Sequence, residues 1–198
     1  SLQNHNHPSD MLVAGIDEAG RGCIAGPVVA AAVIIDDGVF PDSKKISAAA
    51  REKLYQKILI HAKAISICAI SPFVIDRLDI RRASLLAMRC AVRDLDITPN
   101  LVLIDGRDMI PALDIAQQAI IDGDALDFRI GAASIVAKVS RDRLMCAYRQ
   151  LHAAFTFDCH KGYGTRAHYE EIATNGITNV HRQSFRLFAE PKQLSLFD

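Results

Sequence analysis

Two adjacent carboxylates, Asp17 and Glu18, end an apolar stretch and lead into a glycine-rich turn in the segment GIDEAGRG, residues 15–22. Burying even one carboxylate is costly unless it is paired or bound to a metal. Three interpretations compete: a loop that cradles a dinucleotide, two solvated turn acids, and a site for divalent cations. The glycine spacing G-x-G-x-x-x-G and the strand-like sequence after it argue against the dinucleotide loop.

The cation interpretation gains from two further carboxylates, Asp105 in VLIDG and Asp124 in GDA. Carboxylate oxygens suit magnesium or manganese, and two such ions can activate a water and stabilise the leaving oxygen in phosphodiester cleavage. Spacing alone does not decide which residue supplies the fourth carboxylate, because Asp122, Asp127 and Asp142 are alternatives to Asp124. Of these, Asp142 lies four residues after Lys138 on an expected helix, where a surface ion pair explains it.

The elements that must position these carboxylates alternate along the chain. Apolar runs predict strands over residues 12–16, 26–35, 64–70 and 101–105. Ser47, and Ser71 followed by Pro72, are typical of helix starts. Further helices are expected around the apolar stripe from Leu85 to Leu95 and from near Ala132. This order predicts an α/β domain with a mixed sheet, whose ligands gather outside the carboxyl ends of the strands.

Composition sets the remaining bounds. The 198 residues, half of them hydrophobic, suit one domain with a well-buried core. No apolar run approaches the roughly 18 residues of a membrane span, and the polar start lacks a secretory signal, so we expect a soluble cytoplasmic protein. The five scattered cysteines favour buried free thiols over disulfides or zinc ligands. Residues 1–128 carry 13 Lys and Arg against 17 Asp and Glu, whereas residues 129–198 carry 10 against 6.

Seven motifs, in order, make the chain resemble bacterial type 2 ribonuclease H, also called ribonuclease HII. They are GIDEAGRGCIAGPVVAAAV at residue 15, DSKK at 42, VLIDG at 102, GDAL at 123, AASIVAKVSRDRLM at 132, HKGYGT at 160 and HRQSF at 181. The resemblance implies a ribonuclease H-like α/β fold, with a mixed central sheet flanked by helices and a C-terminal helical extension. The expected domain is 11–190, between a disordered tail at 1–10 and a C-terminal tail at 191–198.

The resemblance also implies an activity: hydrolysis of the RNA strand of RNA/DNA hybrids and nicking 5′ of ribonucleotides embedded in DNA, leaving 3′-OH and 5′-phosphate ends. By motif, the catalytic and metal-binding residues are Asp17, Glu18, Asp105 and Asp124, which would hold two Mg²⁺ or Mn²⁺ ions. The alternatives are a hybrid ribonuclease without junction preference and a nucleic-acid-binding module with a dead site. A monomer is expected.

Substrate contacts follow from the same motifs. Gly20, Arg21 and Gly22 match a turn that contacts the ribonucleotide 2′-hydroxyl through backbone groups, the one group that distinguishes RNA from DNA. Tyr163 matches the aromatic that packs on the sugar at the RNA-to-DNA step, against the alternative of a loop anchor. Phosphate contacts are expected from Lys44, Lys45, Ser134 and Arg182. For Lys45 and Arg182 a solvated surface charge is the competing interpretation. The motif residues His160 and His181 are expected to be structural or to flank the substrate.

Three positions depart from the family pattern, and the C-terminus adds a motif. Cys23 stands where proline is frequent, Asp79 where asparagine is usual, and Asp122 where a neutral or basic residue is usual; the two added charges would weaken phosphate contact. In the tail KQLSLFD the side chains of Gln193, Leu194, Leu196 and Phe197 resemble the short peptide with which bacterial repair enzymes dock on the sliding clamp. The alternative is an apolar strip that folds onto its own core.

Overall fold

A computed structural model describes residues 11–38, 40 and 45–188. The predicted tails at 1–10 and 191–198 therefore lie outside the described residues, as does Lys44. No helix among the described residues is long and apolar enough to cross a membrane.

A five-stranded mixed sheet forms the centre of the fold, in the order β3-β2-β1-β4-β5. Its strands are β1 Val13–Ala19, β2 Val28–Ile34, β3 Ala64–Ile70, β4 Leu101–Asp105 and β5 Ala116–Ile120. Strand β2 runs antiparallel to both β1 and β3, whereas β1, β4 and β5 are parallel. The carboxyl ends of β1 and β4 therefore meet at one edge of the sheet, as the sequence predicted.

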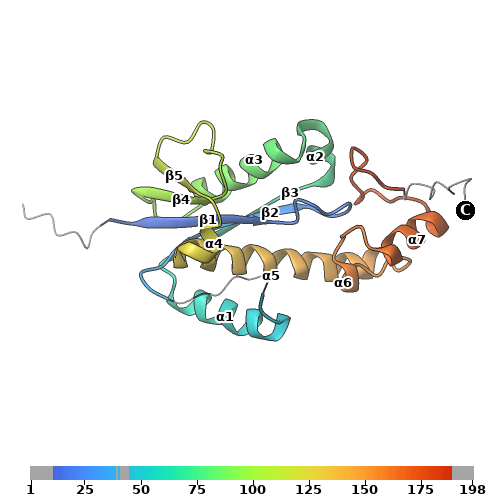
Figure 1. Cartoon of the computed structure of the whole chain (residues 1–198), viewed down its shortest axis with the longest axis horizontal. Coiled ribbons are helices and arrows are strands. Elements are labelled where there is room, and N and C mark those ends of the chain that lie inside the picture. Colours follow the sequence, from blue (N-terminus) through green and yellow to red (C-terminus); the bar gives the residue numbers. More distant parts are fainter. Residues whose placement is uncertain (1–10, 39, 41–44, 189–198) are drawn as a thin grey trace, which may run out of the picture.

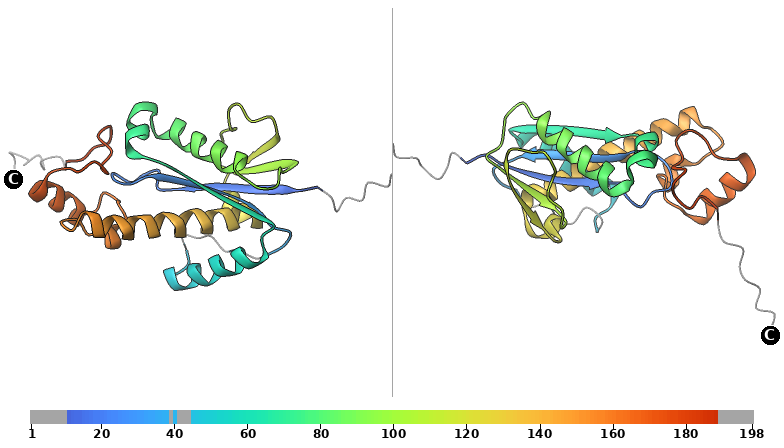
Figure 2. Two further views of the ribbon diagram at one scale, coloured as in Figure 1. Left: turned by 180° about the vertical axis from the view of Figure 1, so that it is seen from behind. Right: turned by 90° about the horizontal axis from the view of Figure 1, so that it is seen from above.

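Helices cover both faces of the sheet (Figures 1 and 2). Helices α2 and α3 lie on one face, α5 and α1 lie on the other, and α6 and α7 pack near the C-terminal end of α5. The bounds are α1 Ala48–His61, α2 Pro72–Leu78, α3 Ile80–Arg93, α4 Gly123–Leu126, α5 Phe128–Leu151, α6 Phe157–His160 and α7 Arg166–Asn175.

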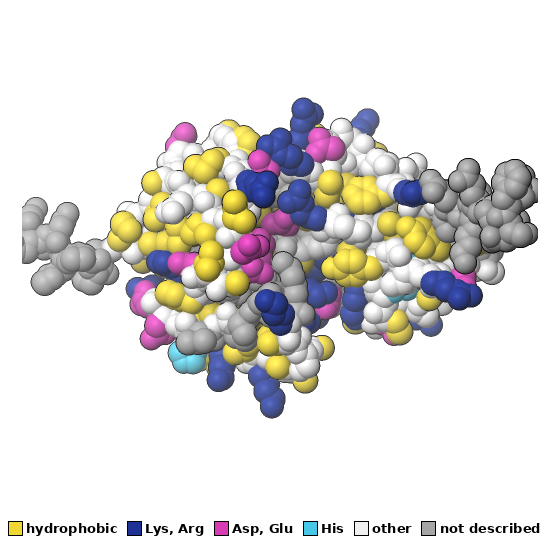
Figure 3. Space-filling model, in the orientation of Figure 1, with side chains coloured by type: hydrophobic (Ala, Val, Ile, Leu, Met, Phe, Trp, Pro, Cys, Tyr) yellow, Lys and Arg dark blue, Asp and Glu magenta, His cyan; other side chains and the backbone are white. Residues whose placement is uncertain are grey.

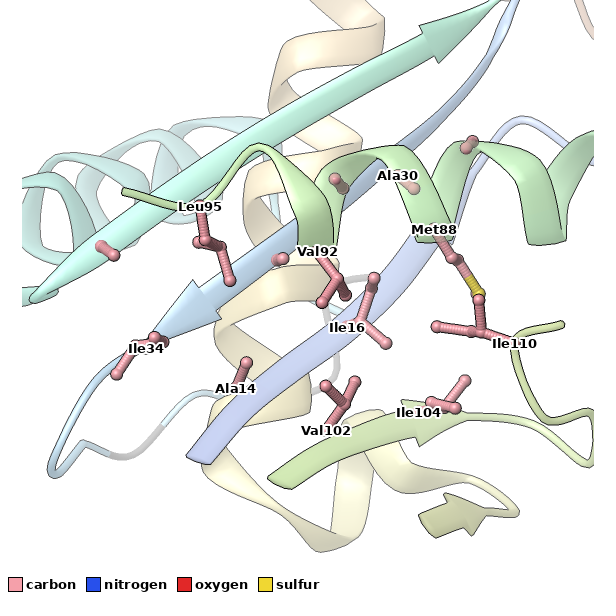
Figure 4. Close-up of a cluster of buried hydrophobic side chains, with 14 residues drawn as sticks. Ala14, Ile16, Ala30, Ile34, Met88, Val92, Leu95, Val102, Ile104 and Ile110 are labelled. Atoms are coloured by element: carbon pink, nitrogen blue, oxygen red, sulfur yellow. The ribbon is translucent and has the colours of Figure 1, made fainter. Parts of the chain in front are cut away.

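Alternating side chains on β1 and β4 build the core that aligns these two strands. Ile16 and Ile104 pack with Met88 and Val92 of α3 on one face (Figure 4). Side chains of the opposite parity, such as Leu103, pack toward α5. This period of two decides which residues at the strand ends share a face.

Helix α5 approaches the sheet closely because β1 carries a glycine where they meet. A Cβ atom added to Gly15 would lie 2.1 Å from the carbonyl carbon of Arg129 and 2.4 Å from the backbone nitrogen of Ile130. The next turns of α5 therefore lie directly beneath the end of β1. The helix is 24 residues long and continues under the C-terminal segment, where Met145 joins a cluster with Phe155 and Phe157.

Most predicted elements are observed, with two corrections. The predicted cap of α1 is confirmed, because the Ser47 hydroxyl accepts a bond from the backbone nitrogen of Ala50 at 3.2 Å. Strand β5 was not predicted, since the edge segment AQQAI is short and half polar. All five cysteines are free, but the expectation that they are buried is confirmed only for Cys23, because Cys68 and Cys90 are partly buried and Cys146 and Cys159 are exposed.

Candidate active site

Asp17 and Asp105 end neighbouring parallel strands on the same face of the sheet. The β1–β4 register pairs Ile16 with Ile104, so the aspartates occupy the next position on each strand. Both isoleucines point toward α3, and both aspartates therefore point toward α5. The Asp17 side chain is almost fully buried, and its Oδ1 accepts a bond from the Glu18 backbone nitrogen at 2.7 Å.

Glu18 follows on the other side of β1 and lies at the mouth of the same site. One carboxylate oxygen, Oε1, lies 3.3 Å from Nη1 of Arg21. The other, Oε2, is buried and has no hydrogen-bond partner among the described residues. A buried carboxylate oxygen without a donor is costly, which points to a ligand that would supply positive charge.

Asp124 lies beside the site on α4, the short helix after β5, and it contacts Asp105 through its backbone. Its backbone nitrogen donates to Oδ1 of Asp105 at 3.3 Å, and its side chain is 6 % exposed. The structure therefore places the residue of the GDA motif beside the end of β4. The rival Asp127 is bound in an ion pair with Arg129 at 2.6 Å, and the rival Asp142 pairs with Lys138 at 2.7 Å, as predicted.

Burial and mutual repulsion raise the pKa values of the first two carboxylates. The pKa of Asp17 lies well above its ordinary value, chiefly because burial penalises the charged form and then because Glu18 and Asp105 are negative neighbours. Burial also raises the pKa of Glu18, with Arg21 acting in the opposite direction. A bound cation would reverse this balance, since it favours the ionised forms.

The donor set fits a hard divalent cation. Its ligating atoms are carboxylate oxygens alone, and one of them, Glu18 Oε2, has no partner in the described structure. In the described part of the chain, however, no three His, Cys, Asp or Glu groups already stand close enough to hold one ion. Ion binding would therefore require the carboxylates to move closer together, and Oε2 of Glu18 could take part while Oε1 stays beside Arg21.

The site is a pocket of about 240 Å³. It is lined by Asp17, Glu18, Ala19, Gly20, Arg21, Asp105, Ser134, Lys138 and Tyr163. A smaller hollow next to it brings Arg81 and Arg107 to the other side of Glu18. Figure 3 shows Asp and Glu side chains near the middle of one face, with Lys and Arg side chains around them. A larger cavity of about 440 Å³ between Phe40 and α1 has a single carboxylate, that of Asp37, among the described residues that line it.

Two buried arginines hold the turn at residues 20–22. Arg182 donates to the carbonyl oxygens of Gly20, Arg21 and Gly26 at 2.6, 2.8 and 3.0 Å. Arg141 lies against Gly20, where an added Cβ would come within 1.9 Å of its Nε. Gly20 also has φ of 92°, so this position requires glycine for two reasons.

Both sequence interpretations of Arg182 need correction. Its side chain is 0 % exposed, so it is neither a solvated surface charge nor in reach of a phosphate. Its guanidinium is instead committed to backbone carbonyls of the turn. Burial lowers its pKa to about 10, which still leaves it charged at neutral pH.

The other expected substrate residues lie around the pocket or beyond it. Tyr163 lines the pocket with 42 % of its surface exposed, and its ring lies 5.7 Å from Nζ of Lys138. Ser134 is buried, and its hydroxyl bonds to Asp17. Gly22 faces open space, with nothing within 4 Å of an added Cβ. Lys45 is exposed outside the pocket.

Sequence reasoning missed three residues around the site. Lys138, treated only as a partner of Asp142, lines the pocket. Its position four residues after Ser134 on one helix could have revealed it, because residues four apart share a face. Arg141 and His168 carry no such signal. The carbonyl of Lys161 lies 20 residues after Arg141, and the bonds of His168 to the Tyr163 carbonyl and to His181 depend on how the loop between them folds.

The two unusual acidic residues have local backbone reasons. Asp79 has φ of 77° and caps α3 by accepting from the backbone nitrogen of Arg82 at 2.9 Å. Asp122 has φ of 54° immediately before α4. Asp and Asn tolerate this left-handed region better than most residues, so Asp can replace Asn at position 79 without loss of the cap.

Fold and site together define the class of protein. A mixed sheet with carboxylates at the ends of two parallel central strands, and a third beside them, is the arrangement of a ribonuclease H-like nuclease. The family model for ribonuclease HII matches residues 14–188, and the chain belongs to this family. It is accordingly a ribonuclease H-type enzyme, and this family is divalent-metal dependent.

Relatives and solved structures agree with this assignment. A ribonuclease HII of Coxiella burnetii is 50 % identical over 195 residues, covering 96 % of this chain and 94 % of its own, and one of Syntrophus aciditrophicus is 47 % identical, covering 94 % and 92 %. The ribonuclease H2 of Pyrococcus horikoshii superimposes with a TM-score of 0.75 at 26 % identity, covering 89 % of this chain and 95 % of its own. The ribonuclease HII in the PCNA complex of Archaeoglobus fulgidus superimposes with a TM-score of 0.74 at 27 % identity, covering 92 % of this chain and 98 % of its own.

Proposed function

We propose that this enzyme nicks the strand on the 5′ side of a ribonucleotide joined to DNA, and that it also cleaves the RNA strand of RNA/DNA hybrids. The observation that carries the proposal is the convergence of Asp17, Glu18 and Asp105 in one pocket, with Asp124 bonded to Asp105 beside it. The products would be a 3′-hydroxyl and a 5′-phosphate.

In this proposal the four carboxylates hold two Mg²⁺ or Mn²⁺ ions. When bound, such ions lower the pKa of water and neutralise the leaving oxygen. Manganese is also bound by the related ribonuclease HIII named Bst-RNase HIII, whose structure shares the fold with a TM-score of 0.69 at 16 % identity, covering 88 % of this chain and 67 % of its own. Ser134 orients Asp17, and Lys138 supplies positive charge beside the reacting phosphate.

Substrate choice is assigned to the opposite side of the pocket. Backbone groups of Gly20, Arg21 and Gly22 would contact the 2′-hydroxyl, since Arg182 and Arg141 hold this turn in place. The ring of Tyr163 would pack on the next sugar, where a deoxyribose offers a more apolar surface than a ribose. Lys44 and Lys45 would contact phosphates of the flanking backbone.

Nicking of a duplex with one embedded ribonucleotide tests the function directly. Wild-type protein should cut with Mg²⁺ or Mn²⁺ and stop after chelation. Asp105→Asn should lose at least about 100-fold in rate, because it removes a charged ligand of the reacting centre. A matched control is Asp36→Asn, which changes an exposed aspartate paired with Lys63 and should cut normally.

Activity of Asp105→Asn at the wild-type rate would overturn the carboxylate assignment. Absence of cleavage by the wild type on any RNA/DNA substrate would favour the binding module with a dead site. The other alternative, a hybrid ribonuclease without junction preference, predicts equal kcat/KM on the single-ribonucleotide duplex and on an all-RNA hybrid. Our proposal predicts a higher value on the former.

We further propose that the C-terminal tail docks on the DNA sliding clamp. Its residues Gln193, Leu194, Leu196 and Phe197 lie outside the described residues, so the support is the sequence motif and the related ribonuclease HII found in a PCNA complex. Clamp pull-down should retain the full chain and lose a chain cut after residue 191. Equal retention of the two chains would exclude docking through this tail.

The expected setting is a monomer in the cytoplasm. Free thiols throughout the chain suit a reducing compartment. Sedimentation at micromolar concentration tests the monomer.

A further inference from the structure

A group of three buried histidines lies behind the loop that carries Tyr163, and the proposed hydrolysis makes no use of it. His160, His168 and His181 are 8, 0 and 1 % exposed. They pack against the rings of Phe155 and Phe157 between α6, α7 and the C-terminal segment. None of the three lines the catalytic pocket.

The hydrogen bonds of His168 and His181 allow one arrangement of protons. Nδ1 of His168 lies 2.8 Å from the carbonyl oxygen of Tyr163, which can only accept, so this nitrogen carries the proton. Nε2 of the neutral His168 ring must then accept, and Nε2 of His181 donates to it at 3.1 Å. Nδ1 of His181 in turn accepts from the backbone nitrogen of Thr178 at 2.9 Å. A continuous relay runs from Thr178 through both rings to Tyr163.

His160 supports the same loop from the other side. Its Nδ1 accepts from the backbone nitrogen of Gly162 at 3.1 Å, and its Nε2 lies 2.9 Å from Oε2 of Glu171. The rings of His160 and His168 stack with centroids 3.9 Å apart. The loop is thus held by imidazoles at two successive residues, Gly162 and Tyr163.

This arrangement leaves no imidazole nitrogen for a metal ion. Every ring nitrogen of the three histidines faces a hydrogen-bond partner, and these side chains do not form one of the groupings of His, Cys, Asp or Glu that could hold a metal ion, of which the described residues contain none. Burial lowers the pKa of His168 and of His181 to about 4. The backbone bonds to Tyr163 and Thr178, and then Glu171, oppose this shift, whereas neighbouring histidines add to it. Both rings therefore stay neutral at pH 7, as the relay requires.

We infer that His168 and His181 are positioning residues that fix the ring of Tyr163 over the pocket by holding its backbone carbonyl. The carbonyl also accepts from the backbone nitrogen of Thr165 at 2.8 Å, so two donors set the plane of this peptide. Loss of the imidazole donor leaves the bond from Thr165 as the remaining restraint on this carbonyl, so the peptide and the ring attached to it gain freedom to move. The consequence for junction preference rests on the proposed function, whereas the positioning itself does not.

A fluorescence experiment tests the positioning without any nucleic acid. The chain contains no tryptophan, so Tyr163→Trp introduces a single reporter at the ring position. Adding His168→Leu removes the donor, whereas adding His168→Asn keeps an amide N–H close to the position of Nδ1. The leucine variant should show lower anisotropy and a roughly twofold higher acrylamide quenching constant, as expected for a loop with weaker local order.

The asparagine variant should stay close to Tyr163→Trp alone. Equal anisotropy and quenching in the leucine variant, with circular dichroism showing a folded protein, would overturn the inference. If the leucine variant does not fold, His168→Gln replaces it, because its longer amide lies near Nε2 instead of Nδ1. Values for the glutamine variant equal to those of the asparagine variant would likewise overturn the inference.

Cleavage assays then separate this inference from the proposed function. The measured quantity is the ratio of kcat/KM on the single-ribonucleotide duplex to kcat/KM on the all-RNA hybrid. His168→Leu should lower this ratio about tenfold, which is the effect expected when a buried hydrogen bond loses one of its partners. In a Tyr163→Ala background the same substitution should not change the ratio further, because the ring that it positions is already absent. A fluorescence change with an unaltered ratio in both His168→Leu and Tyr163→Ala would uphold the positioning and overturn the junction role of Tyr163.

Discussion

At the scale of single residues, buried carboxylates in the site repel one another, and a bound cation would reduce this repulsion. Asp17 is buried beside Glu18 and Asp105, and each of these neighbours makes its ionisation harder. Oxygen Oε2 of Glu18 is buried without a donor in the described structure. Buried groups of this kind cost folding free energy, and such costs are common at functional sites.

This cost predicts that Asp17→Asn stabilises the protein without divalent ions. Since the folded-state pKa of Asp17 is raised, its ionised form at pH 7 costs folding free energy, and the cost falls as pH falls toward that pKa. The neutral amide removes the cost, so chemical denaturation in chelator should show an unfolding free energy about 1–2 kcal/mol higher. The same variant should lose cleavage.

The control is Asp36→Asn, at an exposed position far from the pocket, which should leave the unfolding free energy unchanged. Saturating Mg²⁺ or Mn²⁺ should stabilise the wild type and have a smaller effect on Asp17→Asn, because ligands stabilise only the state that binds them. A less stable Asp17→Asn protein in chelator would contradict this account of the site.

At the scale of elements, the turn at residues 20–22 depends on a segment more than 150 residues later in the chain. Arg182 reaches back to three carbonyls of this turn and its neighbour, and Arg141 of α5 donates to the carbonyl oxygens of Ala25, Pro27 and Lys161. The turn that we propose to contact the 2′-hydroxyl is therefore held in place by the C-terminal segment and by α5 together.

We predict that Arg182→Met lowers the unfolding free energy by about 2–4 kcal/mol, because three buried carbonyls lose their donor. Cleavage should show a raised KM for the ribonucleotide substrate, since the turn loses its support. Urea denaturation and steady-state kinetics measure both effects. Arg166→Met, which changes an exposed arginine paired only within its own helix, should leave both quantities unaltered. If Arg182→Met has the stability of the wild type, the turn keeps its conformation without the hydrogen bonds of Arg182.

Some of these elements could be predicted from the sequence, and others could not. Strand β4 and the start of α1 follow from local apolar pattern and capping, which act within a few residues. The burial of Arg182 could not be predicted, because its partners are backbone carbonyls more than 150 residues away in the chain. The imidazole relay at His168 could not be predicted either, because it depends on the conformation of the Tyr163 loop and on the approach of the His181 side chain. Asp124 was separated from Asp122 and Asp127 by family resemblance alone, and its bond to Asp105 depends on β5, which the pattern did not predict.

At the scale of the whole molecule, the histidine group links stability to acid. His168 and His181 have folded-state pKa values of about 4, whereas unfolded histidines titrate near 6.5. Between these values the unfolded chain binds more protons than the folded one, so the histidines oppose folding increasingly as pH falls. Asp17 and Glu18 act in the opposite direction over part of this range, because their pKa values are raised.

A comparison with His168→Asn isolates the imidazole contribution, since the carboxylates titrate alike in both proteins. The difference in unfolding free energy, wild type minus variant, should fall by on the order of 1 kcal/mol from pH 7 to pH 5. Denaturant titrations at the two pH values measure it. A difference that is constant or grows toward pH 5 would mean that the imidazole of His168 is protonated in the folded state.

Helix α5 has a mechanical consequence for how a duplex is recognised. Its 24 residues span about 36 Å, with Ser134 and Lys138 beside the carboxylates and Arg141 bonded to the Tyr163 loop. The carboxylate pocket and the loop of Tyr163, the proposed sugar contact, are thus both attached to one continuous helix. We expect the distance between the pocket and Tyr163 to stay constant when a substrate binds. The nucleic acid then has to bend to fit the enzyme, and stiff duplexes should be cut more slowly than flexible ones.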